Sequence, residues 1–284
     1  MRVRTSLAVG AGIALVLALA TQATPKAAAM IGPPAMVSAP PSPLAATVPS
    51  FLLPVPAPEP TPEFTPVTID PATYSLGHGP NIGDAVVLTY DDCPASATMY
   101  REVMEYARQQ NIGLVIAPTG ECYRWYLKQG LDLVQVARTN GQYVINHSDS
   151  HPNLKRLGYE KAKRQISGDV ASDYGRPPYG AHNATVDKAY ADAGIRQWLW
   201  DVDTEDWRGK SRQSVVNYTV ANACKGCTVL MHLQHKGFSV TAIGQMKTGL
   251  EARGLVLCRA YRGWDNTGPV EPAPARLGDN ALPC

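Results

Sequence analysis

The stretch that decides the fold is residues 85–92, AVVLTYDD, in which a short apolar run leads directly into two aspartates. A continuous apolar run that ends at polar residues is typical of a strand buried on both faces of a parallel sheet. Residues 113–117 (GLVIA) and 228–231 (TVLM) have the same character. We therefore interpret residues 85–90 as the first buried strand of a folded domain.

Outward from this strand, helical patterns alternate with further strands. Strands are predicted at residues 143–146, 197–200 and 255–257, and helices at residues 98–110, 131–138 and 159–171. This alternation predicts parallel βαβ units, in which active sites form at the carboxyl ends of the strands. The polar residues found at those ends are Asp91, Asp92, His147, Asp203, Asp206 and His232.

Composition limits the class of protein. The chain has 284 residues, of which 45% are apolar and 18% charged, as in a globular protein of one or two domains. Its 26 Lys and Arg against 24 Asp and Glu leave a formal charge of +2, which predicts no nucleic-acid partner. Beyond the N-terminal segment no run of eighteen apolar residues occurs, so we expect no bundle of membrane-spanning helices.

The N-terminus has the pattern of an export signal. Arg2 and Arg4 precede a largely apolar stretch, residues 7–20, and small residues follow, which predicts a signal peptide over residues 1–29. The cleavage site stays open between residues 18–20 and 27–29. Residues 33–71 hold 13 of the 24 prolines, so residues 30–79 are interpreted as a Pro/Ala-rich linker. We expect a secreted or cell-wall-associated monomer without a stable membrane span after cleavage.

Residues 80–266 are predicted to form one catalytic domain, and residues 267–284 an irregular tail. Six cysteines lie in this part of the chain: Cys93, Cys122, Cys224, Cys227, Cys258 and Cys284. An even number in an exported chain favours disulfides, with fifteen connectivities open. We expect one bridge between Cys93 and Cys122. The CxxC pair is interpreted as a local disulfide or as partners of the last two cysteines, with a redox or zinc half-site as the alternative.

One group of residues has the composition of a catalytic metal site. His147 and His151 are four residues apart, so on one helical turn both imidazoles could face one metal ion. One carboxylate of the Asp91-Asp92 pair could be the third metal ligand, and the other would then be free to accept a proton. Three protein ligands keep positions open for water and substrate. Taken singly, an HxxxH pair is more often a surface feature and an Asp-Asp pair a solvated turn.

Five short segments, in this order, resemble the motifs of the polysaccharide deacetylases, the NodB homology domain of carbohydrate esterase family 4. They are TYDDCP (89–94), HxxxH (147–151), RPPY (176–179), DxxDW (203–207) and LxH (230–232). The resemblance covers about residues 80–265. It implies a distorted (β/α)7 barrel that removes acetyl groups from a sugar polymer. It also implies one divalent metal ion, zinc by ligand type, with cobalt or another divalent ion as the alternative.

The resemblance also implies roles for residues around the metal. By position, Asp91 corresponds to the general base and Asp92 to the carboxylate ligand of the metal. The other two ligands correspond to His147 and His151. Arg176 corresponds to the arginine that orients the base.

The remaining roles concern the acetyl group and the leaving amine. The backbone N–H of Tyr179 corresponds to the donor that binds the oxyanion. His232 corresponds to the general acid, and Asp206 to the residue that pairs with it. Trp207 and Leu230 correspond to the walls of the pocket for the acetyl methyl group.

The chain departs from the family pattern at two positions, since Cys93 stands where Gly is usual and Leu233 where Asp is usual. The leading hypothesis is a hydrolase of carbon–nitrogen bonds that deacetylates N-acetylglucosamine units in chitin, chito-oligosaccharides or peptidoglycan. An acetylxylan esterase on the same fold is the first alternative. An inactive carbohydrate-binding domain is the second, and a non-catalytic zinc protein is the weakest.

Overall fold

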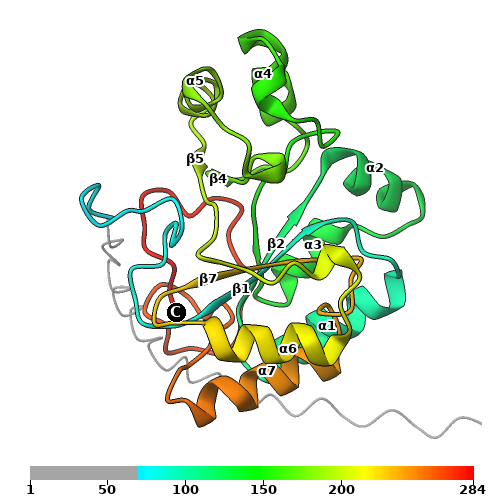
Figure 1. Cartoon of the computed structure of the whole chain (residues 1–284), viewed down its shortest axis with the longest axis vertical. Helices are drawn as coiled ribbons and strands as arrows, with labels where there is room; N and C mark the ends of the chain where they lie inside the picture. The colour runs from blue at the N-terminus through cyan, green and yellow to red at the C-terminus, as the bar shows by residue number, and fades with distance from the viewer. Residues whose placement is uncertain (1–68) are drawn as a thin grey trace, which may run out of the picture. The chain divides into compact units, whose positions relative to one another are not determined.

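The computed structural model describes residues 69–284 (Figure 1). The predicted signal peptide (1–29) and most of the predicted linker (30–79) lie outside the described residues. Among the helices from residue 69 onward, none has both the length and the apolar character needed to cross a membrane.

A parallel sheet of five strands forms the centre of the domain, in the order β3-β2-β1-β7-β6. Its strands are β1 (Val87–Asp92), β2 (Leu114–Pro118), β3 (Tyr143–Val144), β6 (Val202–Asp203) and β7 (Thr228–His232). The central strand β1 is buried along its length except at its last residue, in keeping with its apolar sequence. Helices cover the sheet, as the alternating pattern predicts.

Two further strands extend this sheet into an open barrel. β4 (Tyr174–Gly175) pairs in parallel with β5 (Arg196–Gln197), and a parallel bridge from Asn146 to Gly175 joins β4 to the chain just after β3. Within residues 69–284, no pairing joins β5 to β6. The fold is therefore an α/β barrel of seven parallel strands with one gap, which confirms the predicted fold class.

Within residues 69–284, six helices lie between the strands and a seventh, α7, follows β7. They are α1 (Ala97–Gln109), α2 (Gly120–Lys128), α3 (Leu133–Thr139), α4 (Tyr159–Ile166), α5 (Ala184–Asp192), α6 (Arg212–Asn222) and α7 (Val240–Ala252). Figure 1 shows α6 and α7 lying together with α1 beside them, whereas α4 and α5 pair at the opposite end of the view. Three short 3₁₀ turns, η1 (Leu154–Arg156), η2 (Pro178–Gly180) and η3 (Asp206–Arg208), complete the connections.

The predicted strand at residues 197–200 is wrong in its extent, because β5 ends at Gln197 and β6 begins only at Val202. Between them, Trp198 is fully buried and its indole N–H donates to Thr228 Oγ1 at 2.9 Å. The N–H of Leu199 donates to the carbonyl of Leu76 at 2.6 Å, and not to a neighbouring strand. The predicted strand at residues 255–257 is reduced to a single bridge between Val86 and Leu257.

The segments at both ends of the described chain pack on the domain. Ile69 is buried, and Tyr74 donates a hydrogen bond from its hydroxyl to the carbonyl of Gln197. Leu277 and Leu282 of the predicted tail are buried in the same hydrophobic cluster as Ile69. Residues 69–79 and 267–284 thus contribute to the core, although neither stretch contains a named helix or strand.

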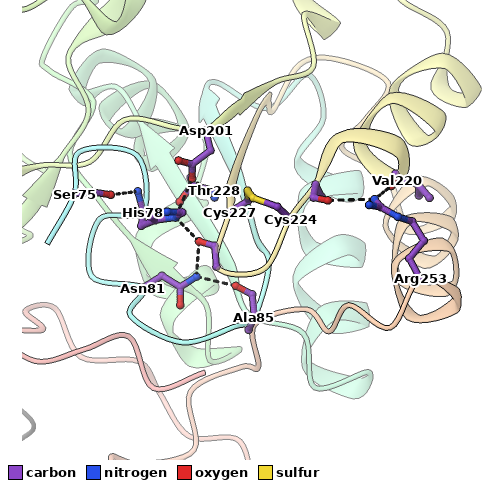
Figure 2. The surroundings of a disulfide bond; sticks show 12 residues. Ser75, His78, Asn81, Ala85, Asp201, Val220, Cys224, Cys227, Thr228 and Arg253 are labelled. Carbon is purple, nitrogen blue, oxygen red and sulfur yellow. Dashed lines mark hydrogen bonds and ion pairs between the residues drawn. A yellow bond between two sulfur atoms is a disulfide. The ribbon is translucent and has the colours of Figure 1, made fainter. Parts of the chain in front are cut away.

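All six cysteines are paired, as Cys93–Cys122, Cys224–Cys227 and Cys258–Cys284. The CxxC pair is a local disulfide, so it does not form half of a zinc site. Figure 2 shows it just before β7, beside His78 and Asn81, both of which contact the carbonyl of residue 226. This disulfide therefore lies at the amino-terminal edge of the strands.

Candidate active site

The carboxyl ends of the strands surround a cavity of about 370 Å³. Its lining consists of Asp91, Asp92, His147, His151, Tyr179, Trp200, Asp203, Trp207, Leu230 and His232. Arg176 and Asp206 lie behind the lining and are almost fully buried. The structure thus brings together all ten residues to which the resemblance assigns a role. Trp200 and Asp203 line the cavity without an assigned role.

Three of these side chains have the spacing of a metal site. Asp92 Oδ1 lies 3.4 Å from His147 Nε2 and 3.2 Å from His151 Nε2, and the three ligand atoms fall within 4.8 Å of one another. A tetrahedral zinc ion with bonds of about 2.0–2.1 Å separates neighbouring ligand atoms by about 3.3 Å. One carboxylate oxygen and two imidazole nitrogens are also ligand types that zinc accepts. The residues present therefore fit the metal that the family implies.

The two histidines do not lie on a helical turn, so that part of the prediction is wrong. Ser148 and His151 have φ angles of 61° and 58°, which no right-handed helix contains. Side chains hold the turn instead, because Asn146 Oδ1 accepts from the Ser148 N–H at 2.9 Å and Ser148 Oγ accepts from the His151 N–H at 3.1 Å. Such local bonds compete with helix formation and still direct both imidazoles to one point.

Two ligands are held from behind by hydrogen bonds. His147 Nδ1 lies 2.8 Å from the carbonyl oxygen of Arg176. Because a carbonyl oxygen can only accept, Nδ1 carries the proton and Nε2 is left free to bind a metal. Gln234 Nε2 donates to Asp92 Oδ2 at 2.8 Å, so Oδ1 remains directed at the histidines. Sequence reasoning missed Gln234, since no motif or spacing singles it out.

The charges of the cluster shift the pKa values of its members. Burial opposes ionisation of Asp92, but hydrogen bonds from His147 and Gln234 outweigh it and hold the pKa of the carboxyl well below its usual range. Burial likewise opposes protonation of His147, but the nearby Asp91 and Asp92 raise its pKa. The pKa of His151 is lowered by burial and by the charge of His147.

The candidate base is fixed by a buried arginine. Asp91 is 3% exposed, and its Oδ1 accepts from Arg176 Nη1 at 2.6 Å. The same guanidinium donates from Nη1 to Thr89 Oγ1, from Nε to the carbonyl of Trp198 and from Nη2 to the carbonyl of Leu199, at 2.8–2.9 Å. Arg176 therefore orients Asp91 and also bonds to the chain that crosses the gap between β5 and β6.

The candidate acid lies on the neighbouring strand. Asp91 and His232 are at the same level in the register of β1 and β7. His232 Nδ1 lies 2.7 Å from Asp206 Oδ1, and the His232 N–H donates to Asp206 Oδ2 at 2.9 Å. Burial lowers the pKa of His232. The hydrogen bond with Asp206 and the charges of the nearby carboxylates together outweigh burial, so the pKa of His232 is raised. The raised pKa favours the protonated form of the His232 imidazole, and its Nδ1 is the atom paired with Asp206.

Aromatic side chains form the rim. Tyr179 and Trp207 are 66% and 49% exposed, which is unusual for such large rings. Gly180, at φ +60°, lies so close to Trp200 that an added Cβ would be 2.8 Å from the indole ring. This contact fixes the turn that carries Tyr179 against the cavity wall.

Backbone strain is concentrated at the same place. The non-glycine residues with positive φ among residues 69–284 are Asp92, Asn111, Ser148, His151, Tyr179, Glu205 and Asn266. Asparagine adopts this conformation most readily, and aspartate and histidine more readily than other side chains; all five residues other than the asparagines lie around the cavity, Asp92 at the end of β1 and the rest in loops. Strained residues of this kind persist only where surrounding contacts fix them, and they cluster at functional sites.

The comparisons with known proteins agree with this geometry. Residues 78–198 match the sequence profile of the polysaccharide deacetylases. The bifunctional xylanase/xylan deacetylase of Cellvibrio japonicus is 31% identical over 192 residues, which are 62% of this chain and 27% of that protein. The peptidoglycan-N-acetylglucosamine deacetylase of Bacillus cereus is 26% identical over 188 residues, 62% of this chain and 66% of that protein. The chain thus spans less than two thirds of both proteins.

A solved structure shows the same architecture. The family 4 carbohydrate esterase of Streptomyces lividans, in complex with acetate, superimposes with a TM-score of 0.53 at 26% identity. The match covers 68% of this chain and 98% of that one. The matching profile, these likenesses and the seven-stranded parallel barrel show that the chain is similar to the polysaccharide deacetylase family in sequence over residues 78–198 and in fold.

Proposed function

We propose that the protein is a secreted, metal-dependent deacetylase that hydrolyses N-acetyl groups of N-acetylglucosamine units in chitin, chito-oligosaccharides or peptidoglycan. One observation carries the proposal: the carboxyl group of Asp91 and the imidazole of His232 face one cavity beside a carboxylate–imidazole cluster with zinc spacing. Base, acid and metal ligands are the groups that metal-assisted hydrolysis of an amide requires.

The metal cluster is assigned to Asp92, His147 and His151. A zinc ion bound there would polarise the acetyl carbonyl and make a bound water more acidic. Asp91 takes a proton from the attacking water through Oδ2, because its Oδ1 is occupied by Arg176. The ion pair with Arg176 keeps the carboxylate in one orientation throughout.

The remaining residues act on the acetyl group and the leaving nitrogen. The backbone N–H of Tyr179 donates to the developing oxyanion, and the loss of such a donor typically costs about 10²–10³ in rate. Trp207 and Leu230 enclose the acetyl methyl group against the cavity wall. His232 donates its proton to the leaving amine, which departs poorly unless protonated.

The pairing of His232 with Asp206 places a candidate proton donor at the cavity, as the leaving amine of an N-acetyl group requires. An alkoxide leaving group needs less help from an acid than an amine does, so N-acetyl groups are the first candidate substrates. O-deacetylation is the second candidate, because one relative is named a xylan deacetylase. We also propose that residues 1–29 direct export, that residues 30–79 act as a spacer and that the protein is a monomer.

The test is acetate release by the full chain, with and without a chelator. Penta-N-acetylchitopentaose, peptidoglycan and acetylated xylan are assayed side by side, with Asp91→Asn as the inactive control. Chelator-sensitive release from either N-acetylated substrate is the expected result. Release from xylan alone would assign the protein as an esterase. A zinc-loaded protein without activity on any of the three would contradict the proposal and favour a binding domain.

A further inference from the structure

The three candidate metal ligands come from two separate segments of chain. Asp92 is the last residue of β1, whereas His147 and His151 lie in the loop that follows β3. β2 separates these two strands in the sheet, so pairing between β1 and β3 cannot set the distance between the segments. β2 pairs with both strands and so relates β1 to β3, but the histidine loop lies beyond the last paired residue of β3 and depends on further contacts.

Helix α2 contacts both segments. At the β1 side, Cys122 of its first turn is disulfide-bonded to Cys93, the residue after Asp92. At the β3 side, the first N–H groups of the helix donate to the histidine loop. The N–H of Gly120 bonds to the carbonyl of Ser148 at 3.0 Å, and that of Glu121 to the carbonyl of Asp149 at 2.8 Å.

A side-chain contact reinforces the second connection. Arg124 Nη1 donates to Asp149 Oδ1 at 2.6 Å and also pairs with Asp169. The helix lies directly against the loop, because a Cβ added at Gly120 would be 2.4 Å from Asp149 Oδ1. Asp149 is midway between the two histidines, so Arg124 holds the turn that presents both of them.

The backbone of Asp92 needs a constraint of this kind. Its φ is 75°, a conformation that a residue with a side chain keeps only when neighbouring contacts hold it. The preceding residue is fixed within β1, and the following one is fixed by the disulfide to α2. Without the disulfide, the chain after Asp92 loses its covalent anchor and the carboxylate can turn away from the histidines.

We propose that α2 is a brace for the metal site, in which the Cys93–Cys122 disulfide and Arg124 are positioning elements that set the separation of Asp92 from the two histidines. The inference rests on the metal site of the proposed function. It makes a distinct claim, namely that metal affinity depends on a disulfide and an arginine that do not themselves touch the metal. Loss of partners that orient ligands typically weakens metal binding about 10–100-fold.

The first test compares two disulfides. Zinc affinity of the full chain is measured by competition with a chromophoric chelator, for wild type, Cys93→Ser/Cys122→Ser and Cys224→Ser/Cys227→Ser. The control disulfide lies at the opposite edge of the strands, beside His78 and Asn81 (Figure 2). We expect about 10–100-fold weaker zinc binding in the first variant and wild-type affinity in the control. Equal affinity in all three proteins would overturn the inference.

A second pair of variants keeps every disulfide, in case the first fails to fold. Arg124→Met removes the contact to Asp149, and Arg253→Met removes an arginine whose Nη1 donates to the carbonyls of Val220 and Ala223 (Figure 2). We expect zinc binding weaker by about two- to fivefold for Arg124→Met alone, at a melting temperature of the metal-free protein close to that of Arg253→Met. Wild-type zinc affinity in Arg124→Met would contradict the brace. Failure of wild type itself to bind zinc would overturn the metal site, and the brace with it.

Discussion

Replacing Arg176 by Met should destabilise the protein far more than the loss of one surface charge. The guanidinium is fully buried and donates to Asp91, Thr89 and the carbonyls of Trp198 and Leu199. Removing one partner of a buried ion pair costs about 3–5 kcal/mol, because the other charge stays behind. Each carbonyl left without a donor increases the loss of stability by about 1–3 kcal/mol, and by less where water can enter. We expect a loss of at least about 4 kcal/mol, a large part of the 5–15 kcal/mol typical of native proteins.

The assay is urea unfolding of the full chain with its disulfides intact, followed by tryptophan fluorescence. Asp91→Asn in the Arg176→Met background removes the unpaired charge, so the double variant should recover about 2 kcal/mol and leave the cost of the carbonyls. Arg276→Met is the matched control, since Arg276 is 67% exposed and pairs with Asp173 at the surface. It should cost at most about 1 kcal/mol. An equal loss in Arg176→Met and Arg276→Met would refute the reasoning.

Three further predictions concern the cavity. Asp91→Asn should keep zinc and lose turnover, whereas Asp92→Ala should lose both; metal analysis and acetate release of the same samples check this. His232 must be protonated to act, so activity should fall as the pH rises through its raised pKa. Asp206→Asn removes the carboxylate that raises this pKa, so the alkaline limb of the pH–kcat profile should move to lower pH; an unmoved limb would argue against His232 as the acid. Gln234→Leu should weaken zinc binding about 10–100-fold in a chelator competition, with wild-type affinity as the contrary result.

The fold was predictable where single segments carry their own signal. Residues 85–90 and 113–117 are predicted as buried strands because they are almost continuously apolar, and the structure places β1 and β2 over them, each shifted one or two residues toward the carboxyl end. β4, with only two residues, is too short to have a pattern. Helix α2 went unpredicted because it has only nine residues, although Cys122 and Tyr126, four residues apart, form its buried face. The break between β5 and β6 depends on Trp198, whose burial is decided by contacts far away in the chain.

In the candidate site, residues that belong to short motifs could be predicted from the sequence, whereas contacts between distant residues could not. The ten residues with assigned roles belong to short motifs in a fixed order, so a single sequence was enough to name them, and the structure brings them together. Their roles stay predictions. Gln234 bonds to Asp92, which is far away in the sequence, and Trp200 lines the cavity in contact with the turn at Gly180. Neither contact has a sequence pattern. The helical turn assumed for the histidines was wrong because Asn146 and its neighbours bond locally.

Arg176 bonds to the segment between β5 and β6, and this has a consequence for how the fold can evolve. A lineage of this fold that no longer needed to cleave acetyl groups could lose Asp92 or His232 by drift, since each lies at the cavity with solvent access. It could not lose Arg176 as freely, because Trp198 and Leu199 would be left without their donors where no strand replaces them. Retention of this arginine in a distant descendant therefore reports an intact barrel, and the proposed ligands, base and acid are the residues that would report a working enzyme.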